Sequence, residues 1–388
     1  MDVDVAGALA HLDAFLEREA AGYADNHAMA KDARAASVAY TETRAIDVDT
    51  AASLAYLAYF GPRAVVAVAR ALRPVPASTG PIHVVDVGAG SGASALAWAF
   101  GGSTSPAPAP VQLTLVEQSP KALELARRLL QRLPAHVQVQ ARPGGLTTVS
   151  SINEATHVSA AFVVGELPPT MDVEAALRRL APSAATTVLV DAGDHPRARR
   201  LQTLRDTLRE RDDVVIHGPC PHRDACPALQ RDRDWCHDRV AKHLPERLAR
   251  FARLVGRDDA LMSLSWLSLG RGPGAAAGQG EDGLVVVGEA RQEKGRVRLP
   301  VCGPRGLRFV QALNRDRAVV DAVAGLARGD RVPAPKGVVG DTWALRTGSG
   351  SDAGADAGAF MAAIKDMNRN APPTPAGASG AGGANDAP

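Results

Sequence analysis

The sequence predicts an α/β protein with a mostly parallel β-sheet covered by helices on both faces. Between residues 83 and 217, short apolar runs alternate with helical stretches, as is typical of consecutive βα units. A glycine-rich turn follows the first apolar run. Helix formers dominate the N-terminal part and short strands the C-terminal part, so we expect N-terminal helices before the sheet and a small antiparallel β region after it.

With 388 residues, the chain is long enough for two or three domains. Hydrophobic residues make up 46% and charged residues 22%, which predicts a sizeable folded core. We divide the chain into an N-terminal helical region (1–75), a Rossmann-like core (76–218), a segment with a cysteine loop, a basic helix and the last core strand (219–270), a basic β-rich region (271–346) and a disordered tail (347–388).

Composition and charge exclude several classes of protein. The net charge of +2 implies no partner by itself. The N-terminus lacks the apolar segment of a secretory signal, and no apolar run reaches the roughly 18 residues of a membrane span. We therefore expect a cytoplasmic protein with reduced cysteines and no membrane partner.

The expected elements follow from apolar periodicity and from turn residues. Gly61-Pro62 is expected to end one N-terminal helix and to start another. A strand begins at His83. Further strands are expected at 112–117, 137–140, 160–164, 186–191, 213–217 and 262–269, helices at 121–133, 172–180, 196–211 and 240–255, a Gly/Ala linker at 270–280, antiparallel strands at 284–290, 295–301 and 307–312, and a short helix at about 360–367.

The glycine-rich turn reads Asp86-Val-Gly88-Ala-Gly90-Ser-Gly92. Glycines let such a turn bend tightly and let a ligand approach the backbone. The next strand ends on Glu117, and an acid there bonds ribose hydroxyls in nucleotide-binding Rossmann-like folds. A dinucleotide site is the alternative, but the chain lacks its G-x-G-x-x-G signature. The turn resembles motif I of S-adenosylmethionine-dependent methyltransferases, which implies that Asp86, Gly88, Gly90, Gly92 and Glu117 bind this cofactor.

Three of the four cysteines, Cys220, Cys226 and Cys236, lie in one polar loop, and the fourth is Cys302. Prolines follow the first two, so the backbone there is extended and has little to fold around unless a ligand binds the thiolates. Gaps of five, nine and sixty-five residues are irregular for zinc. An all-cysteine set suits an iron–sulfur cluster as well as zinc, and buried structural thiols are a third alternative.

Other polar residues of the cysteine loop and the C-terminal region have two interpretations each. His222 and His237 could replace a cysteine in a zinc site, but we expect ordinary polar loop residues. Twelve Lys or Arg stand against six Asp or Glu between Glu289 and Arg346. This asymmetry indicates nucleic-acid binding, or equally the protection of strand edges by charge.

These segments together resemble the methyltransferase-like assembly factors of the small ribosomal subunit, known in mitochondria as methyltransferase-like protein 17. The resemblance covers roughly residues 35 to 345, and the cysteine stretch is its specific part. The matching segments are the glycine turn, Val190-Asp191-Ala-Gly193-Asp194-His-Pro196, Pro219-Cys220-Pro-His, Cys226-Pro, Asp234-Trp235-Cys236-His237, Val301-Cys302 and Gly340-Asp341-Thr-Trp343.

The resemblance implies a class I methyltransferase sheet that binds S-adenosylmethionine. It also implies a 4Fe–4S cluster on Cys220, Cys226, Cys236 and Cys302, and action on the small ribosomal subunit through its rRNA, with no DNA partner expected. Two departures stand out. Family members usually have Gly-Pro-Gly where this chain has Gly90-Ser-Gly92, and often Glu at the place of Asp191.

Methyl transfer is a separate question, because no catalytic residue emerges from the sequence. Amino-group methylases of nucleic acids often carry Asn/Asp-Pro-Pro-Tyr/Phe after the fourth strand, and this chain has Gly165-Glu166-Leu-Pro-Pro-Thr170 there. Glu166 can accept a hydrogen bond from an amine, but no aromatic residue follows for stacking on a flipped base. The alternative functions are a small-molecule or protein methyltransferase with a structural zinc, and an iron or redox sensor.

Overall fold

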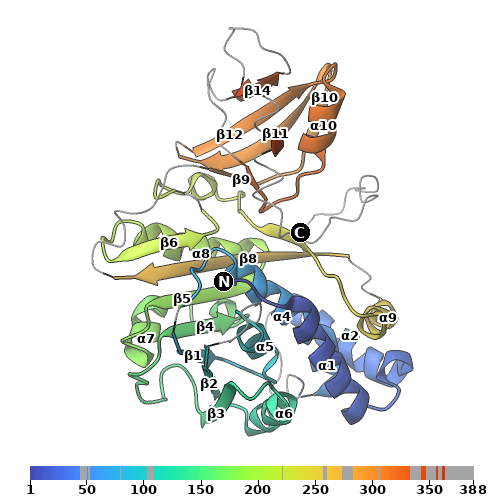
Figure 1. Cartoon of the computed structure of the whole chain (residues 1–388), viewed down its shortest axis with the longest axis vertical. Coiled ribbons are helices and arrows are strands. Elements are labelled where there is room, and N and C mark those ends of the chain that lie inside the picture. Colours follow the sequence, from blue (N-terminus) through green and yellow to red (C-terminus); the bar gives the residue numbers. More distant parts are fainter. Residues whose placement is uncertain are drawn as a thin grey trace.

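The structure is a computed structural model that describes residues 1–43, 50, 53–78, 80–102, 109–220, 222–256, 260–272, 283–304, 306–332, 342–346, 355–356 and 361–362. Its centre is a sheet with strand order β3-β2-β1-β4-β5-β8-β6, and β7 also pairs with β8 (Figure 1). β1 to β5 are parallel, whereas β8 is antiparallel to its neighbours. The strands are β1 (Ile82–Val87), β2 (Val111–Glu117), β3 (Val137–Pro143), β4 (His157–Ala161), β5 (Thr186–Ala192), β6 (Val214–Gly218), β7 (Asp238–Ala241) and β8 (Leu261–Arg271).

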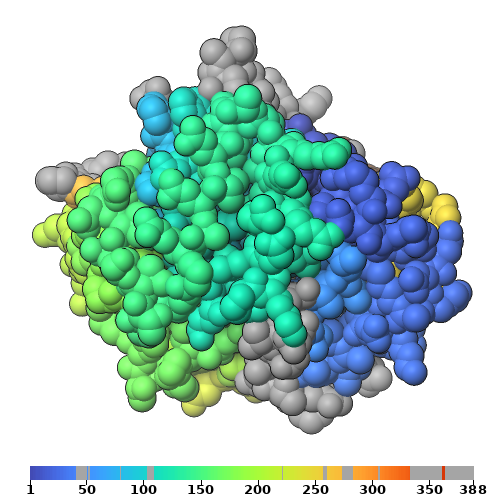
Figure 2. Space-filling view, turned by 90° about the horizontal axis from the view of Figure 1, so that it is seen from below, coloured from blue at the N-terminus to red at the C-terminus, as the bar shows by residue number. Residues whose placement is uncertain are grey.

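The central strands β1, β4 and β5 are buried on both faces, as expected for parallel strands that read as continuous apolar runs. The neighbours Val84 and Val85 belong to two different hydrophobic clusters, one on each face. The helices of the first face are α1 (Val5–Glu19), α2 (His27–Thr43), α4 (Leu54–Leu72), α5 (Ala93–Ala99), α6 (Pro120–Leu130) and α9 (Glu246–Val255), and those of the second are α7 (Val173–Leu180) and α8 (His195–Leu208). From below, the N-terminal helices lie directly beside the core (Figure 2).

The expected α/β architecture is therefore confirmed, with N-terminal helices on one side. No helix in the described ranges is both long enough and apolar enough to cross a membrane.

The expected helix break at Gly61-Pro62 is wrong, because α4 continues through Pro62. A side chain at position 61 would lie 3.0 Å from a methyl group of Leu57 and 3.2 Å from one of Leu12 in α1. Gly61 and Pro62 are both buried, so close packing between α1 and α4 keeps the helix in place despite its proline.

Two other element boundaries differ from expectation. β4 ends at Ala161 instead of extending to Val164, since Phe162 has a left-handed φ of 61° and a short 3-10 helix, η2 (Val164–Glu166), follows. The basic helix predicted from Val240 begins only at Glu246. Residues 238–241 form β7 against β8, and Pro245 stands at the N-cap of α9.

The C-terminal region forms a second sheet with its own hydrophobic cluster, above the core in Figure 1. Strands β9, β11 and β12 pair antiparallel as expected, although β9 ends at Val286 instead of extending to residue 290. In contrast, β14 runs parallel to β12, and helix α10 (Arg317–Ala324) was not foreseen. Most of the predicted 270–280 linker, Gly340, Asp341 and nearly all of the tail lie outside the described residues. The strands are β9 (Leu284–Val286), β10 (Arg291–Glu293), β11 (Arg296–Gly303), β12 (Gly306–Leu313), β13 (Arg331–Val332), β14 (Thr342–Arg346) and β15 (Ala355–Asp356).

Candidate cofactor site and cysteine pocket

The three glycines of the turn after β1 have positive φ angles, but they serve different purposes. A Cβ on Gly88 would lie 2.4 Å from a methyl group of Val163, and one on Gly92 would lie 2.9 Å from the Cβ of Ala126 in α6. Both positions therefore need glycine for packing. A Cβ on Gly90 would meet nothing within 4 Å among the described residues. The turn thus presents open space at Gly90, where a ligand has room to approach the backbone.

Glu117 lies beside this space, as the sequence predicts. Its carboxylate accepts hydrogen bonds from the Gly90 N–H at 3.0 Å and from the Ser119 N–H at 2.9 Å. Each carboxylate oxygen has further lone pairs, so Glu117 retains capacity for ribose hydroxyls. The turn and the acid fit a nucleoside.

Asp86, also predicted to bind the cofactor, lies beneath the turn. It is fully buried and accepts a 2.6 Å hydrogen bond from the Ser94 hydroxyl at the start of α5. Burial raises the pKa of its carboxyl to about 6. In this position Asp86 fixes the helix behind the glycine turn.

A second group of charged side chains lies at the carboxyl ends of β4 and β5, the same edge of the sheet as the glycine turn. Asp191, which is 1% exposed, accepts hydrogen bonds from the N–H of Gly165 at 2.7 Å and of Ala192 at 2.8 Å. The Arg197 guanidinium lies 3.4 Å from Asp191 and 2.6 Å from Asp194. In open α/β sheets ligands bind at this edge, so the cluster stands where a second ligand would enter.

All four cysteines line one cavity of about 490 Å³ between the core and the C-terminal sheet. Cys220 follows β6, Cys226 precedes the short 3-10 helix η3 (Pro227–Gln230), Cys236 precedes β7, and Cys302 lies in β11. The structure therefore brings together residues that are far apart in the sequence. Burial raises the pKa of Cys220 to about 11 and also raises those of the other three thiols.

The described residues contain no group of three or more His, Cys, Asp or Glu that could hold a metal ion. The metal-cluster loop of the expected fold is thus present as a cysteine-lined pocket, and its metal remains a prediction. His222 is not an ordinary polar loop residue, contrary to expectation. It is only 4% exposed, and its Nε2 lies 3.4 Å from the Cys302 sulfur.

Helix α8 holds the cysteine loop from one side. Arg205, which is 2% exposed, donates to the carbonyl oxygens of His222 and, at 2.5 Å, of Asp224. The Asp206 carboxylate accepts from the Cys226 N–H at 2.9 Å, and Gln202 donates to the Cys236 carbonyl at 2.8 Å. The expectation that this loop has little to fold around without a ligand is therefore wrong, because one face of α8 satisfies its backbone.

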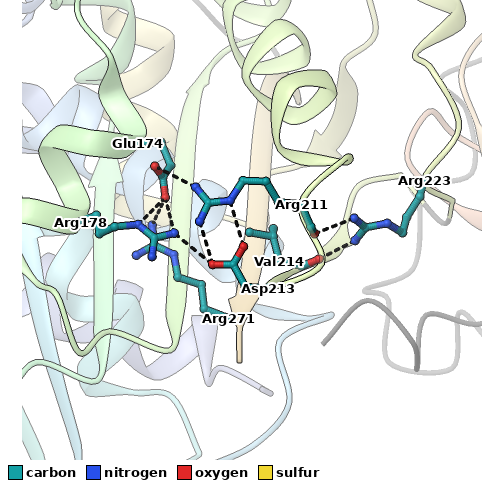
Figure 3. Close-up of polar contacts among 7 residues, drawn as sticks. All are labelled: Glu174, Arg178, Arg211, Asp213, Val214, Arg223 and Arg271. Atoms are coloured by element: carbon teal, nitrogen blue, oxygen red, sulfur yellow. Dashed lines mark hydrogen bonds and ion pairs between the residues drawn. The ribbon is translucent and has the colours of Figure 1, made fainter. Parts of the chain in front are cut away.

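Arg223 holds the loop on its other side, where it donates to the carbonyl oxygens of Val214 and, at 2.8 Å, of Arg211 (Figure 3). It also donates to the carbonyl oxygen of Arg209. Arg211 in turn pairs with Asp213 at 2.7 Å. In the same figure Glu174 accepts from Arg178 at 2.9 Å and from Arg271 at 3.0 Å. This network connects the loop to the starts of β6 and α7 and to the end of β8.

A basic strip on the C-terminal sheet leads to the cysteine pocket. Alternate residues of β11, namely Arg296, Arg298, Pro300 and Cys302, share one face of the strand. On that face the Arg298 guanidinium lies 3.9 Å from the centre of the Phe309 ring. The strip combines positive charge with an aromatic platform, the combination that single-stranded nucleic-acid sites use.

The sequence interpretation missed the residues of α8 that position the cysteine loop. Arg199, Gln202, Arg205 and Asp206 recur at helical spacing, which places them on one face of α8, but charged helical residues usually face solvent. Spacing alone could indicate a shared face. It could not show that the cysteine loop covers that face.

The fold and the site define a methyltransferase-like protein. Its sheet is mainly parallel, with the antiparallel strand β8 between β5 and β6, and a glycine turn follows β1. The chain belongs to the Rsm22 family, since the family model described as mitochondrial small ribosomal subunit Rsm22 matches residues 50–314. The match spans the glycine turn and all four cysteines, and it confirms the predicted resemblance.

The solved structures to which the chain is similar include methyltransferases. A SAM-dependent methyltransferase from Aquifex aeolicus is 15% identical, with a TM-score of 0.32 over 45% of this chain and 92% of its own. The plantazolicin methyltransferase BpumL is 11% identical, with a TM-score of 0.33 over 63% of this chain and 96% of its own. No curated protein matches the chain.

Proposed function

We propose that this protein binds S-adenosylmethionine and acts on the small ribosomal subunit in the cytoplasm, where it contacts rRNA. The observation that carries the proposal is the Rsm22 family match across residues 50–314, because the description of that family names the mitochondrial small ribosomal subunit. The open space at Gly90 beside Glu117 supports the cofactor. The basic strip of β11 and β12 supports contact with RNA.

RNA binding through this strip is expected to weaken steeply with salt, because each phosphate contact releases bound counterions. Replacing Arg298 with glutamine should lower the affinity for isolated small subunits or their rRNA. It should also reduce the slope of log K against log salt by about 1. The measurement is a binding titration at several salt concentrations.

The matched control is Arg127→Gln, since Arg127 is exposed on α6 and pairs only locally with Glu124 at 2.9 Å. This variant should bind as the unaltered protein does. Binding that does not change with salt would contradict the proposed RNA contact.

We further propose that Cys220, Cys226, Cys236 and Cys302 hold a 4Fe–4S cluster. A single zinc ion needs ligands that converge to about 2.3 Å from one point. A four-iron cluster instead spreads four thiolates around a larger inorganic core, which suits cysteines that line one cavity. Bound there, it would link the loop covalently to β11.

Anaerobic purification should yield about four irons and four sulfides per chain. In Cys302→Ser the iron content should fall, and the melting temperature should drop by on the order of 5 °C, because bound metal contributes directly to the free energy of folding. The control is Ser263→Ala, at an exposed position of β8. One zinc without sulfide, or unchanged iron and melting in Cys302→Ser, would contradict the cluster and favour the methyltransferase with a structural zinc.

A further inference from the structure

Four of the chain's few aromatic residues gather where the N-terminal helices approach the carboxyl edge of the sheet. Tyr56 and Phe60 of α4 stack with ring centres 4.4 Å apart. Tyr40 of α2 meets the edge of Phe60 at 6.1 Å, and Tyr59 does so at 4.8 Å. Aromatic residues make up only 4% of the sequence, so this concentration is a local feature that the composition hides.

Tyr40 links these rings to the charged cluster at the ends of β4 and β5. The Arg197 guanidinium, which pairs with Asp191 and Asp194, lies 4.3 Å from the centre of the Tyr40 ring. The Tyr40 hydroxyl is buried and has no hydrogen-bond partner in the part of the chain that the structure describes. A buried hydroxyl without a partner is unfavourable by about 1–3 kcal/mol, so a ligand that supplies a partner would stabilise this arrangement.

The backbone turns sharply to bring Glu166 to the same place. Phe162 directly follows β4 with a φ of 61°, a conformation that is unfavourable for a bulky residue. Its N–H bonds the Val190 carbonyl at 2.7 Å, and the Gly165 N–H bonds Asp191 at 2.7 Å. Strained residues of this kind cluster at ligand sites, where the surrounding contacts enforce them.

Glu166 directly follows Gly165, whose N–H bonds Asp191, so it lies at the charged cluster beside the ends of β4 and β5. Partial burial, followed by the nearby Asp191 carboxylate, raises the pKa of Glu166 to about 7, and the Glu117 carboxylate acts in the same direction. Burial, and next the Glu166 carboxylate, raise the pKa of Tyr56. Glu166 is nevertheless exposed to solvent. It is therefore a hydrogen-bond acceptor that a ligand can reach from solvent at the carboxyl edge of the sheet.

We infer that Glu166, Tyr40 and Tyr56 form the acceptor side of the cofactor site and bind the planar, amino-bearing ring of a nucleobase, cytosine or adenine. The inference rests on the proposed function and names the part of the RNA that this site takes. The rings of Tyr40 and Tyr56 offer an apolar wall to a flat base. The Glu166 carboxylate accepts a hydrogen bond from the exocyclic amine, which uracil lacks.

The test is photo-crosslinking of the full chain to short single-stranded RNAs that carry one 5-iodocytidine, one 8-azidoadenosine or one 5-iodouridine, followed by mass spectrometry of the peptides. At least one of the two amino-bearing probes should crosslink to Tyr40 or Tyr56. The 5-iodouridine probe should do so several-fold less. In Glu166→Gln the amino-bearing and the 5-iodouridine probes should crosslink about equally, because an amide both donates and accepts hydrogen bonds.

Glu124→Gln, at an exposed position of α6, is the matched control and should keep the preference. Crosslinks confined to the basic strip of β11 and β12 would overturn the acceptor site and leave the proposed RNA function intact. Equal labelling of the tyrosines by all three probes would overturn the role of Glu166. No crosslink anywhere would overturn the proposed function, and the acceptor site with it.

Discussion

Replacing Arg205 with methionine is expected to lower the free energy of unfolding by about 3 kcal/mol. The side chain is only 2% exposed, and it donates to the carbonyl oxygens of His222 and Asp224. Methionine fills similar space but donates nothing, so the buried carbonyl of His222 and the partly buried carbonyl of Asp224 would lose a charged donor, at about 1–3 kcal/mol each, less for the second. Chemical denaturation of the purified protein measures the effect.

The matched control is Arg209→Met, one turn further along the same helix. Arg209 is 27% exposed and pairs with the exposed Glu210. Its contacts with the Arg223 carbonyl at 3.5 Å and with Asp206 at 3.7 Å are long, so this variant should lose less than about 1 kcal/mol. If Arg205→Met were as stable as the unaltered protein, α8 would not be what holds the cysteine loop.

Asp238→Ala is expected to destabilise the protein by about 3–5 kcal/mol, because it removes one partner of a buried ion pair. Asp238 is 3% exposed, and it accepts hydrogen bonds from Arg70 of α4 and from the Trp266 indole, both at 2.8 Å. Arg70 also donates to the carbonyl of Gly329, which precedes β13. The variant would leave the Arg70 charge uncompensated at the junction of the N-terminal helices, the core and the C-terminal sheet.

Thermal and denaturant unfolding would measure this loss, with Asp232→Ala as the control. Asp232 is fully exposed and lies 3.7 Å from Arg199, so its removal should leave the stability unchanged. Similar stabilities of the two variants would show that the junction does not depend on Asp238.

Much of the core could be predicted because parallel strands and amphipathic helices have distinct periods in the sequence. The predicted ends of helices and strands were wrong where tertiary contacts override the local sequence pattern. The apolar run after Ala160 continues to Val164, but the bond from the Phe162 N–H to the Val190 carbonyl turns the chain out of the sheet. Similarly, packing between α1 and α4 retains Pro62 inside a helix.

The candidate sites likewise contain some residues that the sequence indicated and others that only the folded structure reveals. Spacing indicated the glycine turn with Glu117, clustering in one polar loop drew attention to the cysteines, and the family resemblance implied the cluster that all four would hold. The aromatic group around Tyr40 and Tyr56 could not be predicted, because it comes from two helices that only the folded chain brings to the ends of β4 and β5. Asp191 stood in a segment already recognised, but nothing local reveals its contact with Gly165.

The position of β8 in the sequence also determines the order in which the parts of the fold can form during synthesis. Among the described strands β6 pairs only with β8, which ends at Arg271. During synthesis, β6 and the three cysteines that follow it therefore leave the ribosome before the strand that joins them to the sheet. Cys302 emerges later still. The thiol pocket is thus among the last parts to form, and newly made chains pass through a stage with an incomplete sheet edge and exposed thiols.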